Sequence, residues 1–424
     1  MTDTTNSGPV LAADGTPLKR SLARALRRQK LRAAALVAPL LIFVLITFLA
    51  PIGDMLFRSV ENDIVAKTLP KTVAALSTWD PKSGELPDEA VYAALADDMQ
   101  IAVAAKNHTK LGSRLNYEMT GASSLFRKSG RSVKKWDLAT DAPFKEKFID
   151  LHKGWGELPI WQTMKIYSPK YTNGYFLNAV DMKKGLDGVE ARPENEKIYW
   201  LLFKRTMFMS MVITISCILL AYPVAWILAN LPMRTSNLLM ILVLLPFWTS
   251  LLVRTSAWKV MLQQQGVIND TLVWLGLVSD ADRLILINNQ FGTIVAMTHI
   301  LLPFMILPMY SVMQTIQPTY LRAAKSLGAT NWTAFWRVYF PQSVPGIGAG
   351  SILVFILSIG YYITPEIVGG NTGTFISNRI AFHISSSLNW GLGAALGAIL
   401  LLAVLLLYWA YDQIVGIDNV KLGG

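Results

Sequence analysis

The sequence predicts an all-α polytopic membrane protein with six transmembrane helices and a large soluble insertion between the first two. Of its 424 residues, 52% are hydrophobic and only 16% are charged, a more apolar composition than soluble domains have. Six runs approach or exceed the roughly 20 apolar residues that cross a bilayer. The long stretch after the first run contains no run of that length. Since lipid offers no partners to backbone polar groups, each run must form a helix.

The predicted organisation divides the chain into five parts. They are a basic tail at 1–32, transmembrane helix one at 33–58, an extracytoplasmic insertion at 59–197, a membrane core at 198–416 and a tail at 417–424. Within the core, helices two to six are predicted at 201–229, 238–262, 291–315, 343–363 and 392–414. Kinks are expected in helix one at Pro39 and Pro51.

The orientation follows from the basic cluster before the first apolar run, which comprises Lys19, Arg20, Arg24, Arg27, Arg28, Lys30 and Arg32. Such clusters mark the cytoplasmic flank of a helix. The N-terminus and the C-terminal tail are therefore predicted to be cytoplasmic, and the insertion extracytoplasmic. The run is too long for a signal peptide and lacks a small-residue cleavage site, so we interpret it as a retained helix. No aromatic residues are interleaved with the cluster, so nucleic-acid binding is not predicted despite the net charge of +11.

The insertion mixes charges of both signs with Trp, Tyr and Gly, which indicates a folded domain. Apolar residues recur at helical spacing over 88–105, where a helix is predicted. The remainder is rich in loops, and its fold is not predicted.

The sequence predicts no catalytic residue, metal site or cofactor. The single cysteine, Cys217, excludes a disulfide within the chain, and the four histidines show no ligand spacing. His299 is expected to be a buried hydrogen-bonding residue. No G-x-x-x-x-G-K-[ST] phosphate loop occurs. The glycines Gly391, Gly393 and Gly397, like Gly346, Gly348 and Gly350, lie in apolar runs, where small residues let helices pack closely.

The segment 320–341, YLRAAKSLGATNWTAFWRVYFP, is polar and basic and lies between two apolar runs. Its spacing reads Arg322-Ala323-Ala324, three residues, Gly328, nine residues, Val338-x-Phe340-Pro341. This resembles the cytoplasmic coupling loop of permease subunits in binding-protein-dependent ABC importers, which reads Glu-Ala-Ala, three residues, Gly, nine residues, Ile-x-Leu-Pro. Arg322 replaces the family's acidic residue, so a salt bridge from this position to the ATPase is in doubt. The alternative is an ordinary amphipathic loop between helices.

The physical chemistry of the segment fits a docking loop. Ala323 and Ala324 are strong helix formers with little bulk, so a short helix there can lie close in a partner's groove. Gly328 can end that helix in a left-handed cap. A second short helix is predicted from Thr330 or Asn331, and Pro341 is expected to start the next membrane helix. The resemblance implies a coupling surface of Arg322, Ala323, Ala324, Lys325, Ser326, Leu327, Gly328, Ala329 and Pro341.

Three further stretches resemble permeases of the spermidine/putrescine group. They are LLPFWTSLLVRTSAW at 244–258, YYITPEIVGG at 361–370 and NWGLGAALGAILL at 389–401. The resemblance covers helix one weakly and 201–414 well, about half of the chain. The large insertion departs from the compact members of the group, which leaves the docking of the binding protein open.

The resemblance implies a multi-pass protein of the bacterial inner membrane that does no chemistry itself. Its implied partners are two copies of a separate ATPase subunit, a second permease subunit, an extracytoplasmic solute-binding protein and a small solute, for which a polyamine such as spermidine or putrescine is the leading expectation. ATP binding would draw the coupling loops together and turn the permease outward to accept the solute.

Charged residues in or beside membrane helices are costly and point to function. Glu366 and Asp54 are predicted to attract a cationic amine at the outer mouth, with Tyr361, Tyr362 and Trp248 offering aromatic faces to it. Arg254 lies inside the third predicted helix. The alternative is structural, because Arg254 and Glu366 can pair with each other and aromatic residues gather at any membrane interface.

Two other classes of function remain open at the level of sequence. A self-sufficient secondary transporter or channel also suits six helices, although the halves show no clear internal repeat. A membrane-anchored sensor or enzyme would use the insertion, which has His108, His152 and several acids but no spaced catalytic constellation.

Overall fold

The computed structural model describes residues 18–415, with side chains from 26 to 413, and divides into two units at Phe57 and Arg58. Residues 1–17 and the predicted tail at 417–424 lie outside the described residues, as do the side chains of Lys19, Arg20 and Arg24.

The first unit is a long helix made of α1 (Leu18–Val44), the π turn η1 (Leu45–Leu49) and α2 (Ala50–Arg58). The stretch Leu26–Arg58 is long and apolar enough to cross a membrane. The helix leaves α geometry immediately before Pro51, whereas it continues through Pro39. Proline lacks an N–H and its ring clashes with the preceding turn, and the wider π turn accommodates both.

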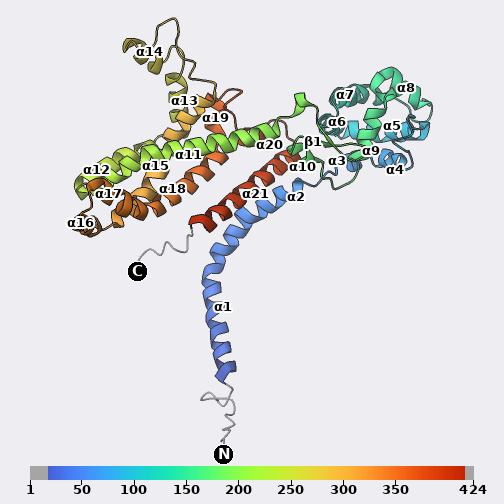
Figure 1. The fold of residues 1–424 in the computed structure, drawn as a ribbon. Coiled ribbons are helices and arrows are strands. Elements are labelled where there is room, and N and C mark those ends of the chain that lie inside the picture. The colour runs from blue at the N-terminus through green and yellow to red at the C-terminus, as the bar shows by residue number, and fades with distance from the viewer. Residues whose placement is uncertain (1–17, 416–424) are drawn as a thin grey trace, which may run out of the picture. The chain divides into compact units, whose positions relative to one another are not determined.

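Three long helices of the second unit lie side by side (Figure 1): α11 (Tyr199–Asn230), α15 (Gln290–Thr315) and α18 (Phe340–Gly360). Glycines let α18 approach α15. A β-carbon on Gly346 would lie 3.0 Å from that of Val312, and one on Gly350 would lie 2.6 Å from Met305 Sδ. The packing role predicted for these two glycines is therefore confirmed.

The described residues contain five helices that are long and apolar enough to span a membrane, and six if one bent pair counts as a single span. The bent pair falls in the predicted third helix, so a single helix over 238–262 is wrong. α12 (Met233–Leu244) continues into a 3₁₀ turn, η4 (Leu245–Trp248), and α13 (Leu251–Met261) departs at 92°. The break has a local cause, since Pro246 removes a donor and Thr249 and Ser250 have extended backbones.

Residues between α2 and α11 form a compact, mostly helical segment. Its helices are α3 (Ile64–Thr68), α4 (Pro70–Leu76), α5 (Glu89–Ala104), α6 (His108–Asn116), α7 (Ala122–Val133), α8 (Phe144–Leu151), η2 (Lys153–Gly156), α9 (Leu158–Ile166), α10 (Gly174–Ala179) and η3 (Glu194–Glu196). A short antiparallel hairpin, β1 (Met182–Lys184) and β2 (Val189–Ala191), pairs Met182 with Ala191. Helix α5 confirms the helix predicted over 88–105.

This segment has its own hydrophobic core, built around large aromatic side chains. Trp155, Trp161 and Tyr92 are fully buried. Their polar tips are paired: Trp155 Nε1 donates to Ser129 Oγ (2.8 Å), while the Tyr92 hydroxyl (2.7 Å) and Trp161 Nε1 (3.1 Å) both donate to the Trp155 carbonyl. Buried aromatics that keep their hydrogen bonds give large apolar burial without a desolvation penalty.

The segment is joined to the membrane helices by a second, smaller core. Helices α20 (Ile376–Ser385) and α21 (Trp390–Val415) pack on each other, and α10 packs on α21. The buried residues that these elements share with α11 are Tyr175, Ala179, Tyr199, Leu202, Phe203, Ile376, Leu392, Ala395 and Leu396.

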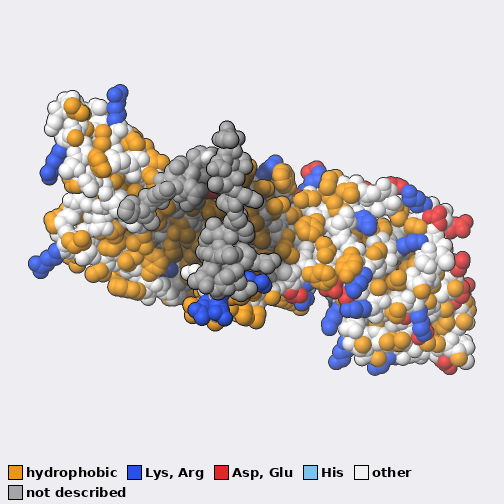
Figure 2. Space-filling model, turned by 90° about the horizontal axis from the view of Figure 1, so that it is seen from below, with side chains coloured by type: hydrophobic (Ala, Val, Ile, Leu, Met, Phe, Trp, Pro, Cys, Tyr) orange, Lys and Arg blue, Asp and Glu red, His pale blue; other side chains and the backbone are white. Residues whose placement is uncertain are grey.

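The surface changes character along the second unit. Figure 2 shows hydrophobic side chains over the long helices on the left of the view and interspersed Lys, Arg, Asp and Glu over the helical segment on the right. Exposed apolar residues include Phe208 and Leu219 on α11, Leu242 on α12 and Leu402 on α21. A further helix, α14 (Val267–Trp274), lies between α13 and α15 and exposes Trp274.

Candidate functional site

The segment 320–341 forms a short helix that ends where its sequence predicts. Helix α16 (Pro318–Ser326) starts with Pro318, whose missing N–H costs nothing in the first turn. It closes with Gly328 N donating to the Lys325 carbonyl (2.9 Å) and Ala329 N donating to the Ala324 carbonyl (3.1 Å). Gly328 has φ +89°, a left-handed conformation that disfavours any side chain.

The second helix of the loop begins as predicted but is not separate. The Thr330 side chain accepts a hydrogen bond from Thr333 N (3.3 Å) and caps α17 (Asn331–Ala334). The chain then passes through the π turn η5 (Phe335–Tyr339) into α18. Pro341 therefore lies in the first turn of α18 within a continuous helix, so the prediction that it starts a new helix is wrong. The π turn precedes Pro341 as η1 precedes Pro51, and for the same reason.

The tip of this loop carries large apolar side chains in the open. The exposed fraction is 90% for Leu327 and 72% for Trp332. The cations Arg322 and Lys325 are also exposed, and neither forms an ion pair among residues 26–413. A mostly apolar hollow of about 390 Å³ lies beside α17. It is lined by Tyr222, Pro223, Trp226, Asn331, Trp332 and Phe335. Exposed apolar residues next to such a hollow are typical of a surface that receives another protein.

The structure brings together only some of the residues that were predicted to contact the solute. Trp248 ends η4 and is largely exposed, and Arg254 lies on α13, half-buried, with Nε lacking a hydrogen-bond partner. Thr255 on α13 hydrogen-bonds Thr364 on α19 (Ile363–Val368) at 3.1 Å, so these two elements touch. Arg254 and Glu366 nevertheless form no ion pair in the described part of the chain.

Glu366 is held instead by an amide. Asn378 Nδ2 on α20 donates to Glu366 Oε2 (2.6 Å) and to the Tyr362 carbonyl (2.9 Å), while Ser377 Oγ donates to the Tyr361 carbonyl (2.6 Å). These bonds fix the turn between α18 and α19, on which Tyr361, Tyr362 and Glu366 lie. A carboxylate accepting a neutral donor keeps its negative charge available to a cation.

Two predicted residues fall elsewhere. Asp54 lies on α2 in the first unit, which is described by itself, so it is not placed with the others. His299 accepts a hydrogen bond from Trp258 Nε1 at Nδ1 (3.1 Å), but its side chain is exposed. The prediction of a buried His299 is therefore wrong, although its hydrogen bond is present.

The sequence did not indicate a buried cap at the start of α11. The Asp181 carboxylate accepts the backbone N–H groups of Ile198 (3.0 Å), Tyr199 (3.0 Å) and Trp200 (2.7 Å). Asp181 is buried and has φ +60°. An anion at a helix N-terminus satisfies orphan donors and complements the helix dipole. Asp181 lies 17 residues before Ile198, the N-cap of α11, too far for a capping motif to reveal it.

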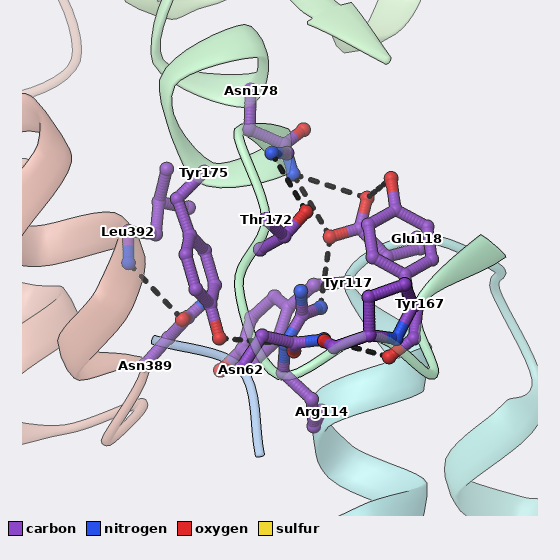
Figure 3. Close-up of polar contacts among 12 residues, drawn as sticks. Asn62, Arg114, Tyr117, Glu118, Tyr167, Thr172, Tyr175, Asn178, Asn389 and Leu392 are labelled. Atoms are coloured by element: carbon purple, nitrogen blue, oxygen red, sulfur yellow. Dashed lines mark hydrogen bonds and ion pairs between the residues drawn. The ribbon is translucent and has the colours of Figure 1, made fainter. Parts of the chain in front are cut away.

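A buried charge network was also missed (Figure 3). Arg114 Nη1 donates to Glu118 Oε1 (2.8 Å), Arg114 Nε donates to the Tyr175 hydroxyl (2.8 Å), and Asn178 Nδ2 donates to Glu118 (3.1 Å). The exposed fraction is 7% for the Arg114 side chain and 3% for that of Glu118. Burial would lower the pKa of Arg114, but Tyr175 and Glu118 raise it overall. Of these contacts, only the Arg114–Glu118 pair could be recognised in the sequence, because residues four apart are neighbours on a helix surface.

The chain matches the family model described as "Binding-protein-dependent transport system inner membrane component" over residues 206–415. It is 33% identical over 222 residues to the "Spermidine/putrescine transport system permease protein PotB" of Salmonella typhimurium strain SL1344, which covers 52% of this chain and 77% of that protein. The protein of the same name from Escherichia coli strain K12 is 32% identical over 222 residues, or 52% and 80% of the two chains.

A second protein of Escherichia coli K12, "Inner membrane ABC transporter permease protein YdcU", is 33% identical over 216 residues, or 48% of this chain and 69% of its own length. Among solved structures, a bacterial alginate ABC transporter in complex with alginate pentasaccharide-bound periplasmic protein has a TM-score of 0.44 and 19% identity, covering 54% of this chain and 81% of that one.

Proposed function

Because the chain belongs to the family of binding-protein-dependent transport system inner membrane components and is the permease subunit of an ABC importer, we propose that it imports a polyamine such as spermidine or putrescine. The observation that carries the substrate is the likeness to spermidine/putrescine permeases across the membrane core. The alternative of a self-sufficient transporter or channel is not supported, because these relatives are permease subunits.

We propose that α16 and the turn after it dock on a separate ATPase subunit at the cytoplasmic face. The small residues Ala323 and Ala324 let the helix enter a groove closely. Leu327 at the tip and Trp332 beside the apolar hollow supply the apolar area that anchors interfaces. Arg322 stands where the family carries an acidic residue. We propose that Arg322 and Lys325 both face acidic residues of the ATPase.

The proposed assembly has two ATPase subunits, a second permease subunit and an extracytoplasmic solute-binding protein. The N-terminus is cytoplasmic in this proposal, and residues 59–197 are extracytoplasmic. ATP binding closes the ATPases and moves the two coupling loops together, which opens the permease outward. The solute then enters from its binding protein and leaves to the cytoplasm after hydrolysis.

Within the proposed path, Glu366 is the residue that attracts the ammonium groups of the solute. Its charge is kept in place by Asn378, on the turn that also bears Tyr361 and Tyr362. Aromatic faces near a carboxylate suit an alkylammonium chain. Arg254 on α13 is positively charged, whereas Glu366 is negatively charged. We therefore assign Arg254 to the edge of the path, where its charge keeps the cationic solute away from α13.

The test is uptake of radiolabelled spermidine and putrescine in the host organism, with the gene deleted and then restored. The proposal expects uptake to be lost on deletion and recovered on complementation. Unchanged polyamine uptake in the deletion strain, with loss of uptake of an unrelated solute, would replace the substrate but keep the permease assignment.

A further inference from the structure

A cavity of about 490 Å³ lies in the second unit where the helical segment meets the start of α21. Its walls come from Arg58 and the chain that follows it, from α6 and α10, and from the loop between α20 and α21 with the first turn of α21. Its volume falls in the range of roughly 300–1,000 Å³ that holds small ligands. Neither the proposed transport path nor the coupling loop uses any of its lining residues.

The charges on the cavity wall are of both signs. Arg58, Lys110 and Arg114 line it together with Glu61 and Asp63. A purely anionic ligand would meet the two acids, and a purely cationic ligand would meet the three bases. A ligand that carries both charges satisfies both groups.

Existing contacts engage three of these five residues, of which Arg58 lies over the Trp390 ring. Arg114 is committed to Glu118, and Asp63 is paired with Lys67. Glu61 and Lys110 form no ion pair within the described residues, and Lys110 is exposed. The cavity therefore offers one carboxylate and one ammonium group to a bound molecule.

The floor of the cavity is rigid. Tyr175, which lines it, receives the Arg114 hydrogen bond, and the Arg114 guanidinium lies 4.5 Å from the centre of the Tyr175 ring (Figure 3). Asn62, which also lines the cavity, donates from Nδ2 to the Tyr167 carbonyl (2.6 Å). Side chains held by buried bonds keep a site in shape before a ligand arrives.

The position of the cavity indicates the source of the ligand. Trp390, which lines it, is the first residue of the apolar span Trp390–Gln413, and Arg58 is the last residue of the apolar span Leu26–Arg58. The Arg58 guanidinium lies 5.9 Å from the centre of the Trp390 ring. Tryptophan and arginine at the ends of spans mark the depth of the lipid headgroups. The cavity is thus at the level at which a headgroup can enter from the bilayer.

We propose that this cavity binds the headgroup of a zwitterionic phospholipid of the phosphatidylethanolamine type. The phosphodiester lies toward Lys110, and the ammonium group lies toward Glu61. Since the walls belong to the helical segment and to α21, the bound lipid fastens one to the other. The proposal is independent of which solute is transported.

The test is native mass spectrometry of the delipidated full chain, reloaded with dioleoyl phosphatidylethanolamine or dioleoyl phosphatidylglycerol. We expect the ethanolamine lipid to be retained roughly tenfold better than the glycerol lipid, because only the former supplies an ammonium group. Glu61→Gln and Lys110→Gln are each expected to lower its retention roughly fivefold. Glu146→Gln and Lys128→Gln, exposed residues outside the cavity, serve as controls and should leave retention unchanged.

Competition with soluble glycerophosphoethanolamine separates the two sources of this chemistry. Displacement of the lipid only at a large excess supports the assignment to lipid. Equal affinity for the soluble compound overturns it in favour of a free zwitterionic solute. Equal retention of the two lipids, or no effect of either cavity variant in protein with an unchanged unfolding midpoint, overturns the site itself.

Discussion

The ring of Tyr175 lies directly against the backbone of Gly391, so closely that a β-carbon on Gly391 would overlap it. Tyr175 belongs to α10 of the helical segment, and Gly391 is in the first turn of α21. Tyr175 is buried and also accepts the Arg114 hydrogen bond. The contact therefore links the buried network of the segment to a membrane helix through one aromatic ring.

This contact predicts opposite effects for two glycines of the same helix. Gly391→Ala should destabilise the protein by about 1–3 kcal/mol, because the ring must shift and strain its neighbours. Gly397→Ala is the matched control, since nothing lies within 4 Å of its added β-carbon. Alanine favours a helix by about 1 kcal/mol over glycine, so the control should be neutral or stabilised. Thermal unfolding in detergent measures both, and equal midpoints would contradict the packing account.

The Asp181 cap predicts a large effect from a small change. Asp181→Ala leaves three backbone donors of α11 without their acceptor and should cost about 1–3 kcal/mol. Asp187→Ala removes an exposed carboxylate that pairs with Lys82 and should leave the unfolding midpoint nearly unchanged. Thermal unfolding of the two variants distinguishes them. A similarly small decrease of the unfolding midpoint in both variants would show that the buried Asp181 cap stabilises the protein no more than the exposed Asp187 does.

His383 predicts a dependence of stability on pH. Burial, and next the charge of Arg379, lower its pKa from 6.5 to about 4. The buried ring contacts the Tyr199 hydroxyl at Nε2 (3.0 Å) and Ser387 Oγ at Nδ1 (3.0 Å). Between these two pKa values the unfolded state binds more protons than the folded state. Stability from this group is therefore full above about pH 6.5, falls as the pH decreases, and stops falling below about pH 4.

The total loss from His383 amounts to about 3 kcal/mol. Unfolding midpoints measured at steps from pH 7.5 to pH 4 should fall more steeply for the natural chain than for His383→Gln, which cannot be protonated. Parallel curves for the two proteins would assign the acid sensitivity to other groups.

Glu366 predicts a dependence of uptake on charge. Glu366→Gln keeps the shape of the side chain but removes its negative charge, which we propose attracts the cationic solute. The apparent KM for spermidine should rise about tenfold, because the electrostatic contact between the carboxylate and the cationic solute is lost. Glu146→Gln, an exposed change on α8, is the control and should leave uptake unchanged. Unaltered kinetics in Glu366→Gln would leave Glu366 as a structural partner of Asn378.

Local sequence signals predicted much of the membrane core. Apolar runs identify spans because lipid permits only fully hydrogen-bonded helices, and the helices at 201–229, 291–315 and 392–414 follow from that rule. The short helix α16 was predictable because glycine favours the left-handed conformation that ends a helix, and Gly328 adopts it. Hydropathy shows that a segment is apolar but not whether its helix is straight. The 92° bend after Pro246 was therefore missed, although the proline was visible in the sequence.

Long-range polar contacts were not predictable. Arg114 and Glu118 are adjacent on α6, but their partners Tyr175 and Asn178 lie about sixty residues away, and no pattern in one sequence links them. Asp181 likewise looks like one acid among many until its three donors are placed around it. Glu366 and Arg254 were read as a candidate pair from their charges, whereas Asn378 holds Glu366.

The loop at 318–341, which we propose to dock on the ATPase, gives the final prediction. Gly328→Asp places a charged side chain at the tip of the loop, where the chain itself leaves open space within 4 Å of the new β-carbon. Gly328→Asn is the matched control, because asparagine has nearly the same shape, tolerates a left-handed backbone and carries no charge. Both variants should insert and fold, so that any difference between them arises at a partner.

The most direct measurement is the recovery of the ATPase subunit with this chain after affinity purification in mild detergent, quantified by mass spectrometry. We expect a co-purifying ATP-binding subunit with the natural chain, about a tenfold loss with Gly328→Asp and a smaller loss with Gly328→Asn. Recovery of the chain without any ATP-binding subunit, or equal recovery of that subunit with all three proteins, would contradict the proposal that the loop at 318–341 couples transport to a separate ATPase.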